Sequence, residues 1–206
     1  MALPKEILKT IISLCAPKLK DFKKIGNHFH RHEGDIIHCI HFQSSQWNSG
    51  ATGQFTVNLI ITSEPLYKIW TGKSMPKNPA TAMWPIQVRL GMLAPRNSDK
   101  WWPLAEGISP EAIAIEITKM IEDYGLPFFS RYSSIDDILK ETSKDQKGSA
   151  MFVHKQIVRA IILSINGDQT GAKRELEAGI EALKKKGISG EVYLTIAERL
   201  NISISA

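Results

Sequence analysis

The fold is decided by residues 28–42, which read HFHRHEGDIIHCIHF. A turn at Glu33-Gly34 predicts one strand over residues 27–32 and a second over 35–45. Two strands joined by so short a turn pair as an antiparallel hairpin. The start of the sheet is therefore expected here.

Side chains that face each other across a hairpin lie on the same side of the sheet. The expected pairs are His32 with Asp35, His30 with Ile37 and His28 with Cys39. One face of the hairpin is then polar and carries His28, His30, His32, Asp35, Cys39 and His41. The other face carries Phe29, Ile36, Ile40 and Phe42, which are typical of a core.

Two more strands extend this sheet. Residues 54–62 follow a glycine-rich loop, and their apolar residues alternate with polar ones as a half-buried strand requires. Residues 86–92 are typical of a fourth strand. Between them, 64–83 contains three prolines and a glycine, which predict a long irregular loop.

Helical periodicity dominates the rest of the chain. We expect helices over 4–16, over 109–124 with Gly125 as the stop, from Ser133 or Ser134, and over 150–165, 168–186 and 190–200. The sequence therefore predicts an α+β fold. It comprises an antiparallel sheet of about four strands with helices on one face, plus a C-terminal helical hairpin.

A polar run over residues 142–149 is the best candidate for a boundary. We expect an α+β domain over 1–145 and a helical extension over 146–206 that packs on it as a lid or brace. A single helical hairpin of this kind is too short to form a repeat array.

The composition favours a cytoplasmic protein that does not cross or bind a membrane. The chain has 206 residues, 43% of them hydrophobic, which is enough for a substantial core. Its apolar stretches are far shorter than the roughly 20 residues that cross a bilayer, and the N-terminus lacks the pattern of an export signal. Cys15 and Cys39 both lie in apolar segments, which is typical of free thiols in the reducing cytoplasm.

The positive charge is concentrated near the N-terminus. Residues 1–31 contain seven Lys or Arg against two acidic residues, a net charge of +5 that equals that of the whole chain. Such a segment can contact phosphates, so a nucleic-acid-associated protein is one alternative. Because no nucleic-acid-binding motif accompanies it, we favour a solvated helix surface.

Five of the six histidines fall within residues 28–41. Of these, His28, His30 and His41 are candidate ligands of a zinc-type metal, which would bind the water that attacks a substrate. The alternative is a solvated strand face without any cofactor. No compact metal-binding spacing such as H-E-x-x-H is present.

A second polar set follows the strands, and its members are Arg31, Gln43, Ser45, Asn58 and Arg89. Amides and guanidinium groups on adjacent strands can orient a carboxylate or phosphate, because they supply several directed donors. They can equally satisfy one another. All five tryptophans lie on or beside loops, where such side chains anchor a partner or close the edge of a core.

No motif of an enzyme is complete. The chain has no G-x-S-x-G elbow, P-loop or dinucleotide fingerprint, and acidic residues are few in the sheet region. We therefore favour a non-catalytic binding or protein-interaction module, of which an immunity-type protein is one form. A metal-dependent enzyme is the first alternative, and the partner, a protein or a small ligand, is unknown.

The strings FQSSQWNSG (residues 42–50), FTVNL (55–59) and DKWWPL (99–104) resemble a bacterial family called domain of unknown function 4304. The resemblance covers about residues 5–140. It implies the fold and no activity. The positions that match the family pattern are Arg31, Gln43, Ser45, Asn58, Arg89 and Trp101.

Overall fold

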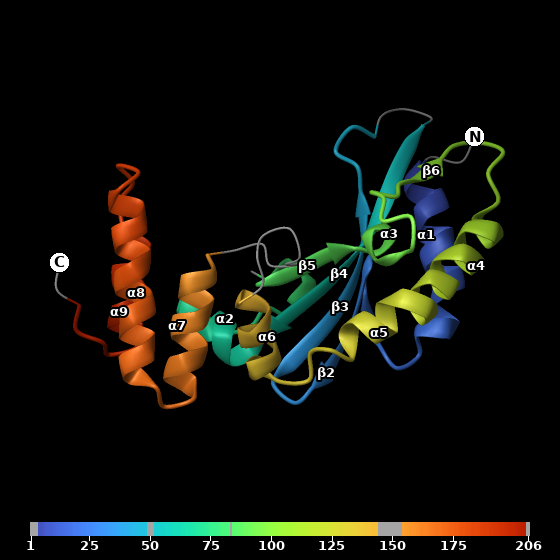
Figure 1. Cartoon of the computed structure of the whole chain (residues 1–206). Helices are drawn as coiled ribbons and strands as arrows, with labels where there is room; N and C mark the ends of the chain where they lie inside the picture. Colours follow the sequence, from blue (N-terminus) through green and yellow to red (C-terminus); the bar gives the residue numbers. More distant parts are fainter. Residues whose placement is uncertain (1–3, 49–51, 83, 144–153, 205–206) are drawn as a thin grey trace.

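The computed structural model describes residues 4–48, 52–82, 84–143 and 154–204, and these form an α+β fold (Figure 1). Its antiparallel sheet has six strands in the order β1-β2-β3-β4-β5, with β6 paired to β4. The strands are β1 (Lys23–Ile25), β2 (His28–Glu33), β3 (Ile36–Ser44), β4 (Gly53–Ser63), β5 (Ile86–Arg89) and β6 (Trp102–Leu104). The two strands beyond the expected four, β1 and β6, have only three residues each.

The β2–β3 hairpin turns at Gly34-Asp35, one residue later than expected. Gly34 has φ of +58°, a conformation that glycine adopts without the steric cost of a Cβ atom. The pairing therefore differs from the expected one by two residues, and His28 faces His41 instead of Cys39. A shift of two residues leaves the side chains of both strands on their expected faces, whereas Asp35, expected on the polar face, lies in the turn.

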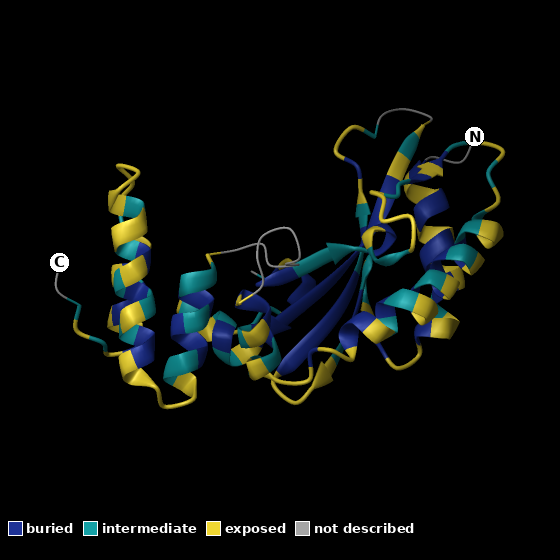
Figure 2. Cartoon of the chain, in the orientation of Figure 1, coloured by how far each residue is buried: buried dark blue, intermediate teal, exposed yellow. Residues whose placement is uncertain are grey.

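One face of the sheet, here called the helix face, is covered by helices and forms the main core (Figure 2). Its strand residues include Phe29, Ile36, Ile40, Phe42, Val57, Leu59 and Ile61. The helices that contribute to this core include α1 (Pro4–Cys15), α4 (Pro110–Met120), α5 (Leu126–Phe129) and α6 (Ile135–Thr142). Burying a large apolar side chain contributes about 1.5–3 kcal/mol, so this layer accounts for much of the stability.

The helix after residue 109 does not stop at Gly125, contrary to the sequence-based expectation. It continues through a π turn, η3 (Ile121–Gly125), directly into α5. A Cβ atom at Gly125 would lie 3.3 Å from Leu59 Cδ1, so glycine allows the helix to approach the sheet closely. Here the glycine serves packing and does not end the helix.

Residues 64–83 are not a wholly irregular loop. They begin with α2 (Glu64–Thr71), in which Pro65 occupies the first turn, a position that a helix tolerates because no intrahelical donor is needed there. A short 3-10 turn, η2 (Pro79–Thr81), follows. Helix α3 (Leu90–Leu93) likewise replaces the end of the expected fourth strand.

The C-terminal part consists of α7 (Lys155–Ile165), α8 (Gln169–Lys184) and α9 (Glu191–Arg199), which lie at one end of the molecule (Figure 1). Helix α7 packs against α2 and α6 as well as α8. The Arg199 side chain donates to the main-chain carbonyls of Ile69 and Trp70 in the last turn of α2. A cation at this helix end also complements the helix dipole.

Candidate functional site on the open face of the sheet

The face opposite the helix face, here called the open face, is only partly covered. A segment around η2 covers one half, where Met75, Ala80 and Trp84 pack in a small apolar cluster. Their partners on the sheet are Ile37, Cys39 and Ile60. The open face thus has a covered apolar half and a polar half beyond it.

A single row of polar residues crosses four strands on this open face. His28 pairs with His41, His41 with Asn58, and Asn58 with Arg89. Because paired residues share a face, the four side chains form a line across β2, β3, β4 and β5, which we call the polar row. The sequence-based histidine set and amide set are therefore parts of one surface.

Asn58 lies at the centre of a short chain of amide groups. It is 1% exposed, and its Nδ2 donates to Gln43 Oε1 at 2.6 Å. Gln87 Nε2 donates to Asn58 Oδ1 at 3.4 Å. Among the described residues, Gln43 Nε2 and Gln87 Oε1 have no partner, so this amide chain ends in one free donor and one free acceptor.

The two histidines of the polar row are stacked and uncharged at neutral pH. Their ring centroids are 4.2 Å apart, with an angle of 25° between the rings. Burial, together with the neighbouring His28, lowers the pKa of His41 to about 4, and burial also lowers the pKa of His28. Asn78 Nδ2 lies 3.1 Å from His28 Nδ1 and so links this pair to the η2 segment.

Arg89, at the other end of the polar row, is already neutralised. Its guanidinium forms an ion pair with Asp99 and lies 5.0 Å from the centre of the Trp101 ring. The neighbouring Trp102 Nε1 donates to Glu116 Oε2 at 2.8 Å, and Lys100 pairs with the same carboxylate. These contacts fix the segment that holds Trp101 at the edge of the row.

The three candidate metal ligands share the open face. His28 and His41 stack on each other, whereas His30 is 5% exposed and its Nδ1 has no hydrogen-bond partner among the described residues. Within the ranges that the structure describes, no group of three or more His, Cys, Asp or Glu side chains is placed to hold a metal ion. We therefore do not propose a metal site.

Arg31 lies on the helix face, away from the other members of its predicted set. Its Nε donates to Nδ1 of the fully buried His38 at 3.3 Å, and its guanidinium lies 4.8 Å from the centre of the Phe22 ring. His38 Nε2 in turn donates to the carbonyl of Tyr132 at 2.7 Å, and burial lowers the His38 pKa. Arg31 thus ties β2 to the helical layer.

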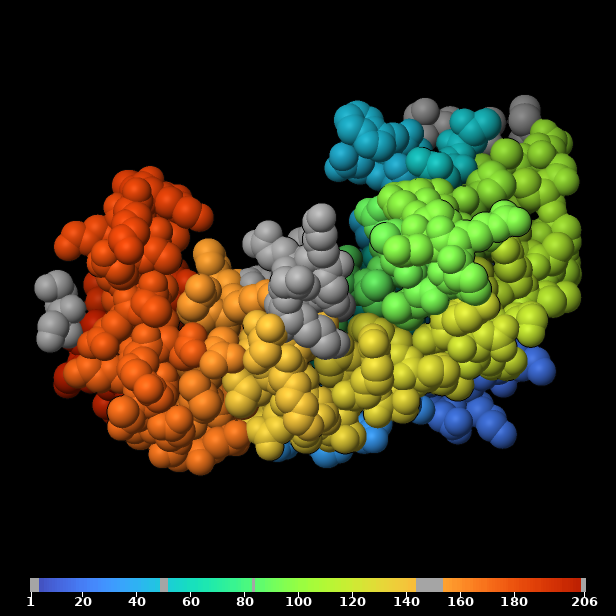
Figure 3. All heavy atoms as spheres, viewed as in Figure 1, coloured from blue at the N-terminus to red at the C-terminus, as the bar shows by residue number. Residues whose placement is uncertain are grey.

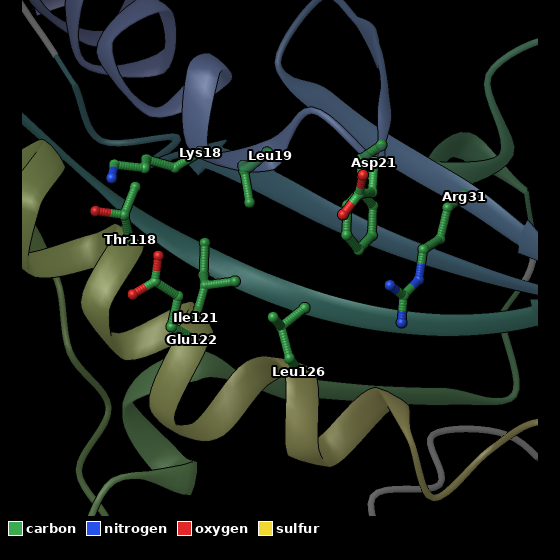
Figure 4. Close-up of a pocket in the computed structure, with 9 residues that line it drawn as sticks. Lys18, Leu19, Asp21, Arg31, Thr118, Ile121, Glu122 and Leu126 are labelled. Atoms are coloured by element: carbon green, nitrogen blue, oxygen red, sulfur yellow. The ribbon is translucent and has the colours of Figure 1, made fainter.

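Arg31 also lines a small pocket between β2 and the η3 turn (Figure 4). The charged side chains around this pocket carry both signs, and they are Lys18, Asp21, Arg31 and Glu122. With a volume of about 40 Å³ the pocket holds a few water molecules, far below the several hundred Å³ of a typical ligand site.

Ser45 and Trp47 follow the end of β3, where local hydrogen bonds hold the described residues. The Ser45 hydroxyl accepts from the Trp47 N–H at 3.2 Å, and the Asn48 side chain bonds both the N–H and the carbonyl of Gln54. The Trp47 residue nevertheless is 80% exposed. Sequence reasoning placed Trp47 on a loop but could not separate it from Trp102, which is buried.

Comparison with known proteins finds a family match. The family described as Domain of unknown function (DUF4304) matches residues 16–131, which include all six positions that we associated with the family pattern. No curated protein and no solved structure matches the chain. Of the helices in the described ranges, none is both long and apolar enough to cross a membrane.

Proposed function

The chain belongs to the DUF4304 family, a domain of unknown function, and we propose that it is a non-catalytic, cytoplasmic protein-interaction module. The observation that carries this proposal is the polar row, in which His28, His41 and Arg89 are half-buried around the buried Asn58. Nothing in the fold requires a buried asparagine there, since a β-branched residue would pack well at such a position. A polar row with free amide ends is suited to binding a partner.

The chemistry of the row favours binding over catalysis. A histidine whose pKa is about 4 accepts a proton poorly at neutral pH, so His41 is a weak general base. Burial raises the pKa of Cys15 and Cys39 to about 12, which leaves neither thiol available as a nucleophile. The two unpaired, buried cysteines also support a reducing compartment, the cytoplasm.

Trp47 supports a protein as the partner. An exposed tryptophan on an internally hydrogen-bonded loop loses little entropy when it enters a partner's pocket, and such residues dominate binding energy at many interfaces. Figure 3 shows the molecule indented between residues 45–48 and 52–55 on one side and the C-terminal helices on the other. An immunity-type protein that neutralises a partner fits this build by analogy only.

We also propose that residues 1–145 form the family domain and 146–206 a helical extension of it. The family match ends at residue 131, and α7 packs on α2 and α6 of the preceding part. The predicted boundary itself falls within residues 144–153, outside the described ranges.

Site-specific photo-crosslinking in living cells tests the proposed interaction. A photoreactive phenylalanine at position 101, beside the polar row, should form a defined covalent adduct with one cellular protein. The same group at position 115 is the control, because Ile115 is 69% exposed but lies on α4 in the helical layer. Gln43→Ala should weaken the adduct at position 101.

Two results would contradict the proposal. One is an adduct that forms at position 115 and not at 101. The other is turnover of a small substrate by the purified protein that is lost in Gln43→Ala, because that loss would place the row in an active site.

A further inference from the structure

We infer that the polar row binds an uncharged, extended peptide segment of the partner. The row would form hydrogen bonds with the main-chain or side-chain amides of that peptide. This inference rests on the function proposed above and specifies its ligand. It follows from the free ends of the amide chain, from the dimensions of the row and from its charge.

The amide chain offers the two groups that a peptide unit needs. Each peptide unit carries one N–H donor and one carbonyl acceptor. The free Gln43 Nε2 can donate to such a carbonyl, and the free Gln87 Oε1 can accept from such an N–H. Asn58 joins the two ends, and hydrogen bonds in such a chain polarise and strengthen one another.

The length of the row suits a short extended segment. Four neighbouring strands, at about 4.8 Å each, place His28 and Arg89 about 14 Å apart at the main chain. An extended peptide advances about 3.3 Å per residue, so about four residues span the row. The stacked imidazoles at one end and Trp101 at the other give such a segment flat surfaces to pack on.

The charge of the row disfavours an anion, although the sequence suggested a carboxylate or phosphate. Of the two arginines in the predicted set, Arg31 lies on the helix face and Arg89 is paired with Asp99. The pKa values of His28 and His41 are lowered, which keeps both rings neutral at pH 7. At the row itself an anionic ligand would therefore be desolvated beside two neutral rings and an arginine that is already paired.

Nuclear magnetic resonance of the full ¹⁵N-labelled chain tests this inference with defined probes. The first probe is the blocked peptide acetyl-Gly-Gln-Asn-Gly-amide, and the second is acetyl-Gly-Glu-Asp-Gly-amide, which differs only in having carboxylates for the side-chain amides. Maltotetraose and inorganic phosphate are the others. The first probe should shift the side-chain NH₂ signals of Asn58 and Gln43, and the other three should not.

Gln43→Glu is the diagnostic variant, because it keeps the oxygen that accepts from Asn58 but removes the free donor. This variant should raise the Kd for the amide peptide at least about tenfold, because a tenfold change in Kd corresponds to the free energy of about one hydrogen bond. Gln169→Glu makes the same chemical change at an exposed position on α8 and should leave binding unchanged.

Tighter binding of phosphate, the acidic peptide or maltotetraose would overturn the inference. So would the absence of shifts with every probe. If no probe binds while the adduct at position 101 still forms, the ligand class is wrong and the interaction module stands. If the adduct also fails to form, the proposed function fails with it.

Discussion

The two faces of the sheet are built from the same strands, but one forms an apolar core and the other carries hydrogen-bonded polar side chains. On the helix face, Phe42 is fully buried. The centroid of its ring lies 5.9 Å from the ring centroid of Phe29 and 6.2 Å from that of Phe55. One residue along the chain, Gln43 is half-buried on the open face and bonds to Asn58. Alternation along one strand thus separates a core from a polar surface.

This difference teaches where stability and binding reside in the molecule. The helix face buries large apolar side chains against helices that include α1, α4, α5 and α6, which makes it sensitive to any loss of volume. The open face keeps buried polar atoms whose hydrogen bonds contribute little net stability but fix the direction of donors and acceptors. Substitutions on the two faces should therefore have separable effects, and the following predictions are arranged from the largest expected effect to the smallest.

Phe42→Ala should lower the free energy of unfolding by about 3–5 kcal/mol, because it leaves a cavity in the main core. Gln43→Ala should cost only about 1–2 kcal/mol, the penalty for leaving the buried Asn58 amide without its acceptor. Urea titration of both variants measures the two values. Equal losses would show that the open face contributes as much to stability as the core.

Acidification should destabilise the protein through its histidines. The folded state lowers the pKa of His41 to about 4, while the unfolded chain binds a proton near the ordinary value of 6.5. Above pH 6.5 His41 is neutral in both states. As the pH falls toward 4, the unfolded chain binds a proton that the folded protein does not, so the free energy of unfolding falls by about 2–3 kcal/mol.

His41→Gln removes this titration, so its unfolding free energy should fall less between pH 7 and pH 4 than that of the unchanged protein. Urea titrations at both pH values measure the difference. Part of the acid sensitivity should persist, because the pKa values of His28, His30 and His38 are also lowered. Identical pH profiles for the two proteins would contradict the assignment to His41.

Arg199→Ala should loosen the attachment of α9 to α2 and cost about 1 kcal/mol, because two carbonyls lose a charged donor. Hydrogen exchange should accelerate in α2 and α9 and remain unchanged in β3 and β4. Arg174→Ala, at an exposed position on α8, is the matched control. Faster exchange in the central strands would mean that the C-terminal helices support the sheet itself.

Trp47→Ala should change the free energy of unfolding by less than about 0.5 kcal/mol, since the residue is 80% exposed. The same change should weaken the crosslinked complex about tenfold or more if Trp47 anchors the partner. Thermal unfolding and quantitative crosslinking provide the two readings. Large destabilisation without loss of the adduct would assign Trp47 a structural role.

Much of the sheet could be predicted because strand alternation is robust to small errors. The turn was placed one residue too early, yet the two-residue change in pairing left both faces correct. The same alternation should have placed Arg31 with Phe29 on the helix face.

Other features depend on contacts that a single sequence does not reveal. The polar row joins His41 and Asn58 to Arg89 only because β4 pairs with both β3 and β5 in a particular register. The role of Gly125, within the π turn, becomes clear only from the proximity of Leu59 on a distant strand. Helix α2 is hard to recognise from the sequence because Pro65 resembles a helix break, although proline is common in a first turn.

The contact between Arg199 and α2 also has a consequence for synthesis of the chain. The carbonyl of Trp70 is made 129 residues before the arginine that caps it. At 5–20 residues per second a ribosome needs about 6–26 s to cover that distance. Arg199 is therefore not available to the last turn of α2 until several seconds after β6, the last strand of the sheet, has been synthesised.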